Sequence, residues 1–134
     1  MSVMASVFSR VIAGELPGRF VHRDDDVVAF LSIAPLTTGH TLVVPRAEVD
    51  DWTALDSGLW GHVMAVTARV GVAVKDAFGA PRAGVVIAGF EVPHTHVHVF
   101  PAYGLADFDF ARARHDVPAA EFDEAQRKIV SALS

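Results

Sequence analysis

Apolar residues recur at helical spacing in three stretches of the chain, and each stretch is predicted to form a helix. The first covers residues 3–13, a long second one covers about residues 56–78, and the third covers about residues 118–133. Asp56 is suited to cap the start of the long helix, and Gly79 is suited to end it. The core-facing stripe of this helix is predicted to be Leu59, Val63, Val66, Val70 and Val74.

Short runs rich in β-branched and aromatic residues fall between these helices and are predicted to form strands. A charged turn at residues 23–26 separates the first two runs, which indicates a hairpin, and residues 102–116 are expected to be irregular. Five strands and one dominant helix predict an α+β domain with a mostly antiparallel sheet. The predicted strands cover residues 19–22, 27–32, 40–44, 85–88 and 95–100.

Length and composition fit one globular domain over residues 1–134, since 51% of the residues are hydrophobic and 20% are charged. The chain has no cysteine, which excludes disulfides and thiolate metal ligands and fits a reducing cytoplasm. No apolar run reaches the roughly 18 residues that a membrane span requires, and we expect no signal peptide. The net charge of −5 argues against a nucleic acid or a membrane surface as the partner.

Three of the seven histidines stand at alternate positions, His94, His96 and His98, at a predicted strand. Alternate strand residues share one face, so neighbouring imidazoles are expected about 6.6 Å apart in a row. One metal ion could bind two neighbours but could not reach all three. Neutral imidazoles can instead divide the work, with one as a nucleophile toward phosphorus and another fixing tautomers or moving protons. A metal-binding module and ordinary surface or core histidines are the alternatives.

The surroundings of this row resemble the histidine triad (HIT) family, whose signature is His-x-His-x-His followed by apolar residues. The resemblance extends over about residues 3–101 and leaves residues 102–134 as a C-terminal extension with its own helix. It implies a HIT-like fold, and the Gly-x-Glu-Val-Pro-His sequence before the triad is similar to a bacterial subgroup. The matching blocks, which follow the family's order, are residues 6–17, 28–35, 38–45 and 94–100.

The resemblance implies a nucleotidyl hydrolase or transferase that acts on the α-phosphate of a nucleoside phosphoramidate or a related nucleotidyl substrate. His96 would attack the phosphate and form a nucleotidyl-histidine intermediate. His98 would bind the phosphate, His94 would lie behind the site or on its leaving-group side, and His40 would pack behind the row. The implied partners are a purine nucleotide such as AMP and a second copy of the chain, with long helices and sheets paired. The implied base cleft consists of Phe8, Val11, Leu16, Phe30 and Ile33, for which plain core packing is the alternative.

Many HIT proteins bind a structural zinc ion through a Cys-x-x-Cys on the opening helix, a histidine after the central strand, and the first triad histidine. The corresponding positions in this chain are Ser6, Ser9 and Glu48. We therefore expect no zinc, no other cofactor and no metal-binding residues.

Three further positions bear on the substrate. Ser32 stands where the family often has an acidic residue or asparagine that contacts ribose, and a serine cannot clasp two hydroxyls as a carboxylate does. Gly89 lets the backbone pass close to a phosphate, or simply forms a turn. Glu91 falls near the expected phosphate position, where its carboxylate would repel the phosphate. Glu91 could instead orient a histidine, act as an acid, bind a cationic leaving group, or pair with an arginine. A nucleotide-binding regulatory protein with little turnover is therefore the alternative function.

Overall fold

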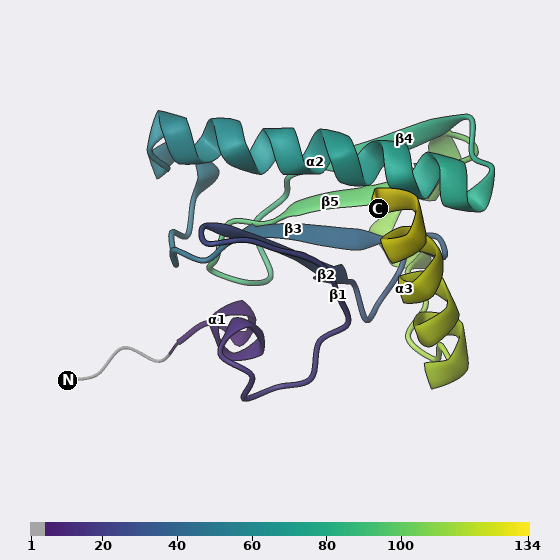
Figure 1. Cartoon of the computed structure of the whole chain (residues 1–134), viewed down its shortest axis with the longest axis horizontal. Coiled ribbons are helices and arrows are strands. Elements are labelled where there is room, and N and C mark those ends of the chain that lie inside the picture. The colour runs from purple at the N-terminus through teal and green to yellow at the C-terminus, as the bar shows by residue number, and fades with distance from the viewer. Residues whose placement is uncertain (1–4) are drawn as a thin grey trace.

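A five-stranded sheet in the order β1-β2-β3-β5-β4 forms the centre of the molecule, and every neighbouring pair of strands is antiparallel (Figure 1). The computed structural model describes residues 5–134. Its helices are α1 (Val7–Ile12), α2 (Ser57–Phe78) and α3 (Ala119–Leu133). Its strands are β1 (Phe20–Arg23), β2 (Val27–Leu31), β3 (Thr41–Pro45), β4 (Arg82–Val86) and β5 (Val97–Ala102). The predicted α+β class is confirmed.

The two faces of the sheet are covered by different helices, so its central strands are buried on both sides. Helix α2 lies along one face, α1 lies against the other, and α3 packs near the C-terminal end of α2 (Figure 1). Alternation along β2 shows the division, because Val27 and Ala29 join the α2-side core whereas Val28 and Phe30 join the α1-side core. The predicted stripe of α2 is confirmed, with Leu59 partly buried at its edge and the four valines Val63, Val66, Val70 and Val74 buried.

The ends of α2 follow the predicted local chemistry. The Asp56 carboxylate accepts hydrogen bonds from the Gly58 and Leu59 backbone N–H groups, which satisfies two free donors of the first turn. Gly79 has a φ of 61°, the left-handed conformation that ends many helices and that a glycine adopts without strain. Among the described residues, no helix has the length and apolar character needed to cross a lipid bilayer.

Several predicted boundaries are wrong, each for a physical reason. Helix α1 begins only at Val7, because the Ser6 side chain caps it by accepting the Ser9 N–H; residues 3 and 4 of the predicted helix lie outside the described residues. Strand β4 begins three residues earlier than predicted, because Arg82 already pairs with Ala102 of β5, and it ends at Val86, opposite His98. The stretch after Pro101 contains two short 3-10 helices, Leu105–Phe108 and Phe110–Arg112, rather than only irregular chain.

The segment that carries the first two triad histidines is not part of β5. The strand begins at Val97, and the preceding Thr95 instead bonds the chain beyond β3, with its backbone N–H 2.7 Å and its hydroxyl 2.8 Å from the Val49 carbonyl oxygen. This change of partner turns the chain around His94 and His96, while His98 stays in the sheet.

Candidate functional site

The three triad histidines and His40 are all buried. They form a row along β3, from His94, which contacts Pro45 at the end of this strand, to His40, which precedes its start. His98 belongs to β5, and His40 immediately precedes β3, the neighbouring strand. The ring centroids of His96 and His98 lie 5.0 Å apart, and those of His40 and His98 lie 5.1 Å apart. The His96 and His98 rings are therefore closer than the rise of about 6.6 Å between alternate residues of a straight strand.

The His40–His98 pair has one consistent arrangement of protons. The Leu36 backbone N–H donates to His40 Nδ1 at 2.9 Å, so this nitrogen must be an acceptor. The Nε2 of His40 lies 2.9 Å from His98 Nδ1 and therefore carries the proton of this second bond. In a neutral His98 the remaining proton then lies on Nε2, which makes that nitrogen a donor.

A backbone carbonyl group determines the tautomer of His96. The Nδ1 of His96 lies 2.7 Å from the His94 carbonyl oxygen, which can only accept a hydrogen bond, so Nδ1 carries the proton. The lone pair of a neutral His96 is thus on Nε2. This is the protonation state that a nucleophilic imidazole requires.

His94 is held by partners on three segments of the chain. Its Nε2–H donates to the Pro45 carbonyl oxygen at 2.7 Å, so its Nδ1 accepts a hydrogen bond from the Ser6 hydroxyl, also at 2.7 Å. Glu48 completes the group, because one carboxylate oxygen accepts the Ser6 backbone N–H at 2.6 Å and the Ser9 hydroxyl at 2.8 Å. The three positions that depart from the zinc-ligand pattern thus form a hydrogen-bonded cluster around the first triad histidine.

Burial keeps His94, His40 and His98 neutral near neutral pH. It lowers the pKa of His40 to about 3, and the neighbouring His98 and His96 act in the same direction. It likewise lowers the pKa of His98 to about 4, with a further contribution from His96. Burial is also the main cause that lowers the pKa of His94. The tautomers deduced from the hydrogen bonds are therefore the relevant states of His94, His40 and His98.

A pocket of about 170 Å³ opens beside the row. It brings His96 and His98 together with Gly89 and Glu91, as the sequence predicted for one site. Gly89 has a φ of 79° with open space where a side chain would lie, so the turn itself requires a glycine. The exposed Glu91 has no ion-pair partner within residues 5–134, so the arginine pairing considered for it is absent there.

The residues expected to hold a base do not all come together. Phe8, Val11 and Phe30 are buried in the α1-side core, with Leu16 packed at its edge. The Phe8 ring contacts the row edge-on, with its centroid 4.9 Å from that of His96. Ile33, by contrast, is 82% exposed and lies outside this cluster.

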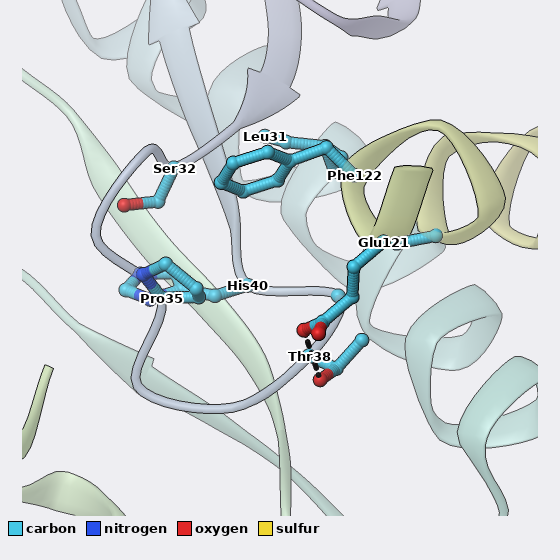
Figure 2. A pocket seen from close by; sticks show the side chains of 9 residues that line it. Leu31, Ser32, Pro35, Thr38, His40, Glu121 and Phe122 are labelled. Carbon is cyan, nitrogen blue, oxygen red and sulfur yellow. Dashed lines mark hydrogen bonds between the residues drawn. The ribbon is translucent and has the colours of Figure 1, made fainter. Parts of the chain in front are cut away.

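Ser32 does not line the pocket beside His96; it lines a separate, narrow cavity between the loop before His40 and α3. Figure 2 shows Ser32 and His40 on the loop, with Glu121 and Phe122 facing them from α3. The Glu121 carboxylate accepts the Thr38 hydroxyl at 3.2 Å and binds the Arg114 guanidinium, 2.6 Å away. The Ser32 hydroxyl accepts the Ala34 backbone N–H at 3.2 Å, so its local role is to shape the loop.

Two features of this site were missed from the sequence. Phe110, in the segment expected to be irregular, lines the pocket and packs edge-on against His98 with ring centroids 4.9 Å apart. Glu121 ties α3 to the loop before His40. No local signal marks either residue, because both contacts join distant parts of the chain. Within residues 5–134, no three histidine, cysteine or acidic side chains are grouped so as to hold a metal ion.

Comparison with known proteins places these features in a family. The model of the HIT domain matches residues 13–105. An uncharacterized HIT-like protein of Borreliella burgdorferi is 34% identical over 92% of this chain and 94% of its own length.

Two solved structures have the same fold over nearly their whole length. A HIT-like protein of Bartonella henselae, described as involved in cell-cycle regulation and solved with an unknown ligand, has a TM-score of 0.85 at 29% identity and covers 95% of both chains. A zinc-bound histidine triad family protein of Mycobacterium smegmatis has a TM-score of 0.83 at 27% identity, covering 97% of this chain and 94% of its own.

Proposed function

The chain belongs to the HIT, or histidine triad, family, and from this premise we propose that it transfers the nucleotidyl group of a nucleoside phosphoramidate, or a related nucleotidyl substrate, to water or another acceptor through a covalent intermediate on His96. The class of nucleotide-binding hydrolase or transferase comes with the family. The observation that carries the finer proposal is the hydrogen bond from His96 Nδ1 to the His94 carbonyl oxygen, which leaves the Nε2 lone pair available.

In the first step, His96 Nε2 attacks the α-phosphorus and a P–Nε2 bond forms. The P–N bond to the leaving group breaks, its electron pair goes to the leaving nitrogen, and this nitrogen takes up a proton to depart as an amine. Negative charge on the phosphoryl oxygens faces the Nε2–H of His98, whose proton is placed there by the chain of hydrogen bonds from Leu36 through His40. His40 thus acts as a positioning residue.

In the second step, water attacks the phosphorus on the opposite side from Nε2, and the P–Nε2 bond breaks. Its electron pair returns to Nε2, the water loses a proton, and a nucleoside monophosphate is released. We expect a purine nucleotide such as AMP, with its base near the apolar Phe8, which adjoins His96. The exposed Ile33 is on a short loop and would have to close over the base.

We propose that the chain functions without structural zinc. Neutral serine hydroxyls are poor zinc ligands, and here those of Ser6 and Ser9 are engaged with His94 and Glu48. The residues at the zinc-ligand positions therefore do not fit the ion. Elemental analysis of the protein purified without added metal should show no stoichiometric zinc; one zinc per chain would refute this part of the proposal.

We also propose a homodimer that pairs α2 and β4 of two copies. β4 is an edge strand, so one row of its backbone hydrogen-bonding groups lacks a partner within the sheet. Val85 on β4 and Val72 on α2 are 43% and 59% exposed, respectively, which leaves apolar surface there. Light scattering should give twice the chain mass, and Val72→Asp should shift the protein toward monomer.

The enzymatic proposal is tested by incubating the protein with an adenosine 5′-phosphoramidate and following AMP release. We expect turnover by the wild type and a loss of at least about a thousandfold in His96→Ala, because no other group in the pocket can form the intermediate. Thermal unfolding of the variant checks that it is folded. Equal turnover by a folded His96→Ala protein would refute the mechanism.

The alternative, a nucleotide-binding regulatory protein with little turnover, is favoured by one observation. Glu91 puts a carboxylate that has no ion-pair partner among residues 5–134 into the pocket where the phosphate would bind, which opposes an anionic substrate. Calorimetric AMP binding together with no product from a panel of phosphoramidates would support this alternative over catalysis.

A further inference from the structure

The pocket beside His96 and His98 has an unusual charge for a phosphate site. Its lining residues are Ala88, Gly89, Phe90, Glu91, His96, His98 and Phe110. Glu91 is the one charged side chain among them, and neither lysine nor arginine lines the pocket within the described part of the chain. Because burial lowers the pKa of His98 to about 4, that imidazole adds no positive charge near neutral pH.

A nucleoside phosphoramidate carries a negative charge on its phosphoryl group, so Glu91 opposes its binding unless something on the substrate compensates. Two like charges in close proximity repel each other, and the repulsion is stronger in a partly enclosed pocket than in open water. The carboxylate has no ion-pair partner within residues 5–134 that would neutralise it. A positive charge on the ligand would supply this compensation.

The position of Glu91 assigns that charge to the leaving group. The nucleoside is expected on the α1 side of the row, where Phe8 contacts His96. Glu91 and Phe110 line the pocket that opens beside His96 and His98, and Phe110 packs against His98. A group leaving the phosphorus in line departs away from His96 Nε2 and so enters the space that these two residues border.

Two aromatic rings complete this side of the pocket. Phe110, which lines the pocket, is 37% exposed, and Phe90, which also lines it, is 97% exposed. A phenyl face attracts both apolar chains and cations. An exposed phenylalanine next to an unpaired carboxylate is thus suited to a ligand that combines an alkyl or aromatic body with a positive charge.

We propose that Glu91, Phe90 and Phe110 form a leaving-group subsite that selects nucleotidyl substrates whose leaving amine has an apolar body and a second, positively charged group. This inference rests on the proposed function and adds the substrate class to it. Glu91 is a specificity-determining residue here, and it takes no part in bond making or breaking.

The test compares three adenosine 5′-phosphoramidates whose leaving amines have the same chain length and end in an ammonium, a methyl or a carboxylate group. For the wild type, kcat/KM should fall in that order, by roughly tenfold per step at low salt. Glu91→Gln, which keeps the shape and removes the charge, should bring the three values within about twofold to threefold of one another. Glu91→Lys should reverse the order.

Glu124→Gln removes an exposed carboxylate from α3, away from the pocket, and serves as the matched control that keeps the wild-type order. Affinities of the same three compounds for folded His96→Ala are measured by calorimetry, so that the subsite is tested even without turnover. An absence of turnover by the wild type would refute the proposed reaction. The subsite itself would be refuted if His96→Ala bound the three compounds with equal affinities and the wild type showed the same relative kcat/KM values as Glu91→Gln.

Discussion

Three backbone groups decide which nitrogen of each imidazole carries a proton. The Leu36 N–H can only donate, so it makes His40 Nδ1 an acceptor. The proton of His40 is therefore on Nε2, which donates to His98 Nδ1. The carbonyl oxygens of Pro45 and His94 can only accept, so they fix the protons on His94 Nε2 and His96 Nδ1. Each triad histidine thus has one determined tautomer, and the site is pre-arranged before any substrate binds.

The buried histidines predict how stability depends on pH. The folded-state pKa of His40 is lowered from 6.5 to about 3, so as pH falls below 6.5 the unfolded chain binds a proton that the folded chain resists. His98 behaves alike down to about 4. The free energy of unfolding is therefore highest above 6.5 and should fall by up to about 1.4 kcal/mol per pH unit for each histidine below it.

Denaturant unfolding at a series of pH values measures this slope. His40→Gln removes the titrating group but keeps a donor toward His98, so its unfolding free energy should depend less steeply on pH by about 1 kcal/mol per unit. Carboxylates titrate in both proteins and cancel in the comparison. Identical slopes for the wild type and His40→Gln would show that His40 is not buried in its neutral form.

Among the secondary-structure elements, helix α1 is only six residues long, so its stability depends on contacts with other segments. Ser6 at its N-cap joins it to His94, and Glu48, from the segment after β3, joins Ser6 and Ser9. The Glu48 carboxylate thus holds the helix in place. Through the His94 carbonyl group it also helps to position His96, the proposed nucleophile.

Replacing Glu48 tests this coupling between α1 and the row. Glu48→Ala should lower the melting temperature and reduce kcat/KM by about tenfold, because small displacements of a nucleophile are costly. Glu48→Gln keeps an oxygen acceptor and should recover most of both losses. The control Glu15→Ala removes an exposed carboxylate near the other end of α1 and should change neither quantity. Wild-type activity in Glu48→Ala would contradict the positioning role.

The loop from Ser32 to His40 is held by close packing at Gly39. This glycine has a φ of 99°, and a Cβ atom there would lie 2.4 Å from the Phe78 ring of α2. Gly39→Ala should therefore lower the free energy of unfolding by about 2–5 kcal/mol, through both strain and overlap. Gly14→Ala is the matched control, since its φ of 83° is similar but its surroundings are open. It should cost about 1 kcal/mol, from strain alone; equal losses would contradict the packing argument.

The whole molecule depends on contacts between distant segments that periodicity does not reveal. The antiparallel α+β class, the stripe of α2 and the grouping of His96 with His98 could be predicted, because they follow from local spacing and burial. The start of β5 at Val97 could not, because Thr95 finds its partner in Val49.

The C-terminal extension shows the same limit of sequence reasoning. Ala125 and Ile129 of α3 join the α2-side core, Glu121 binds Thr38, and Phe110 packs against His98 of the histidine row. The periodicity of the sequence predicts the helix itself but not where it packs. The local sequence around a polar residue such as Glu121 does not indicate which distant hydroxyl group it will bind. The extension therefore contributes to the site as well as to the core.

The most direct test of the central claim is to trap the covalent intermediate. An adenosine 5′-phosphoramidate is mixed with the protein, the reaction is quenched within a turnover, and the intact mass is measured before fragmentation locates the label. We predict one added adenylyl group on His96, absent when the same mixture is made with His96→Ala. An adenylyl group on another residue, or product formed by the wild type with no adduct at any time, would contradict the account.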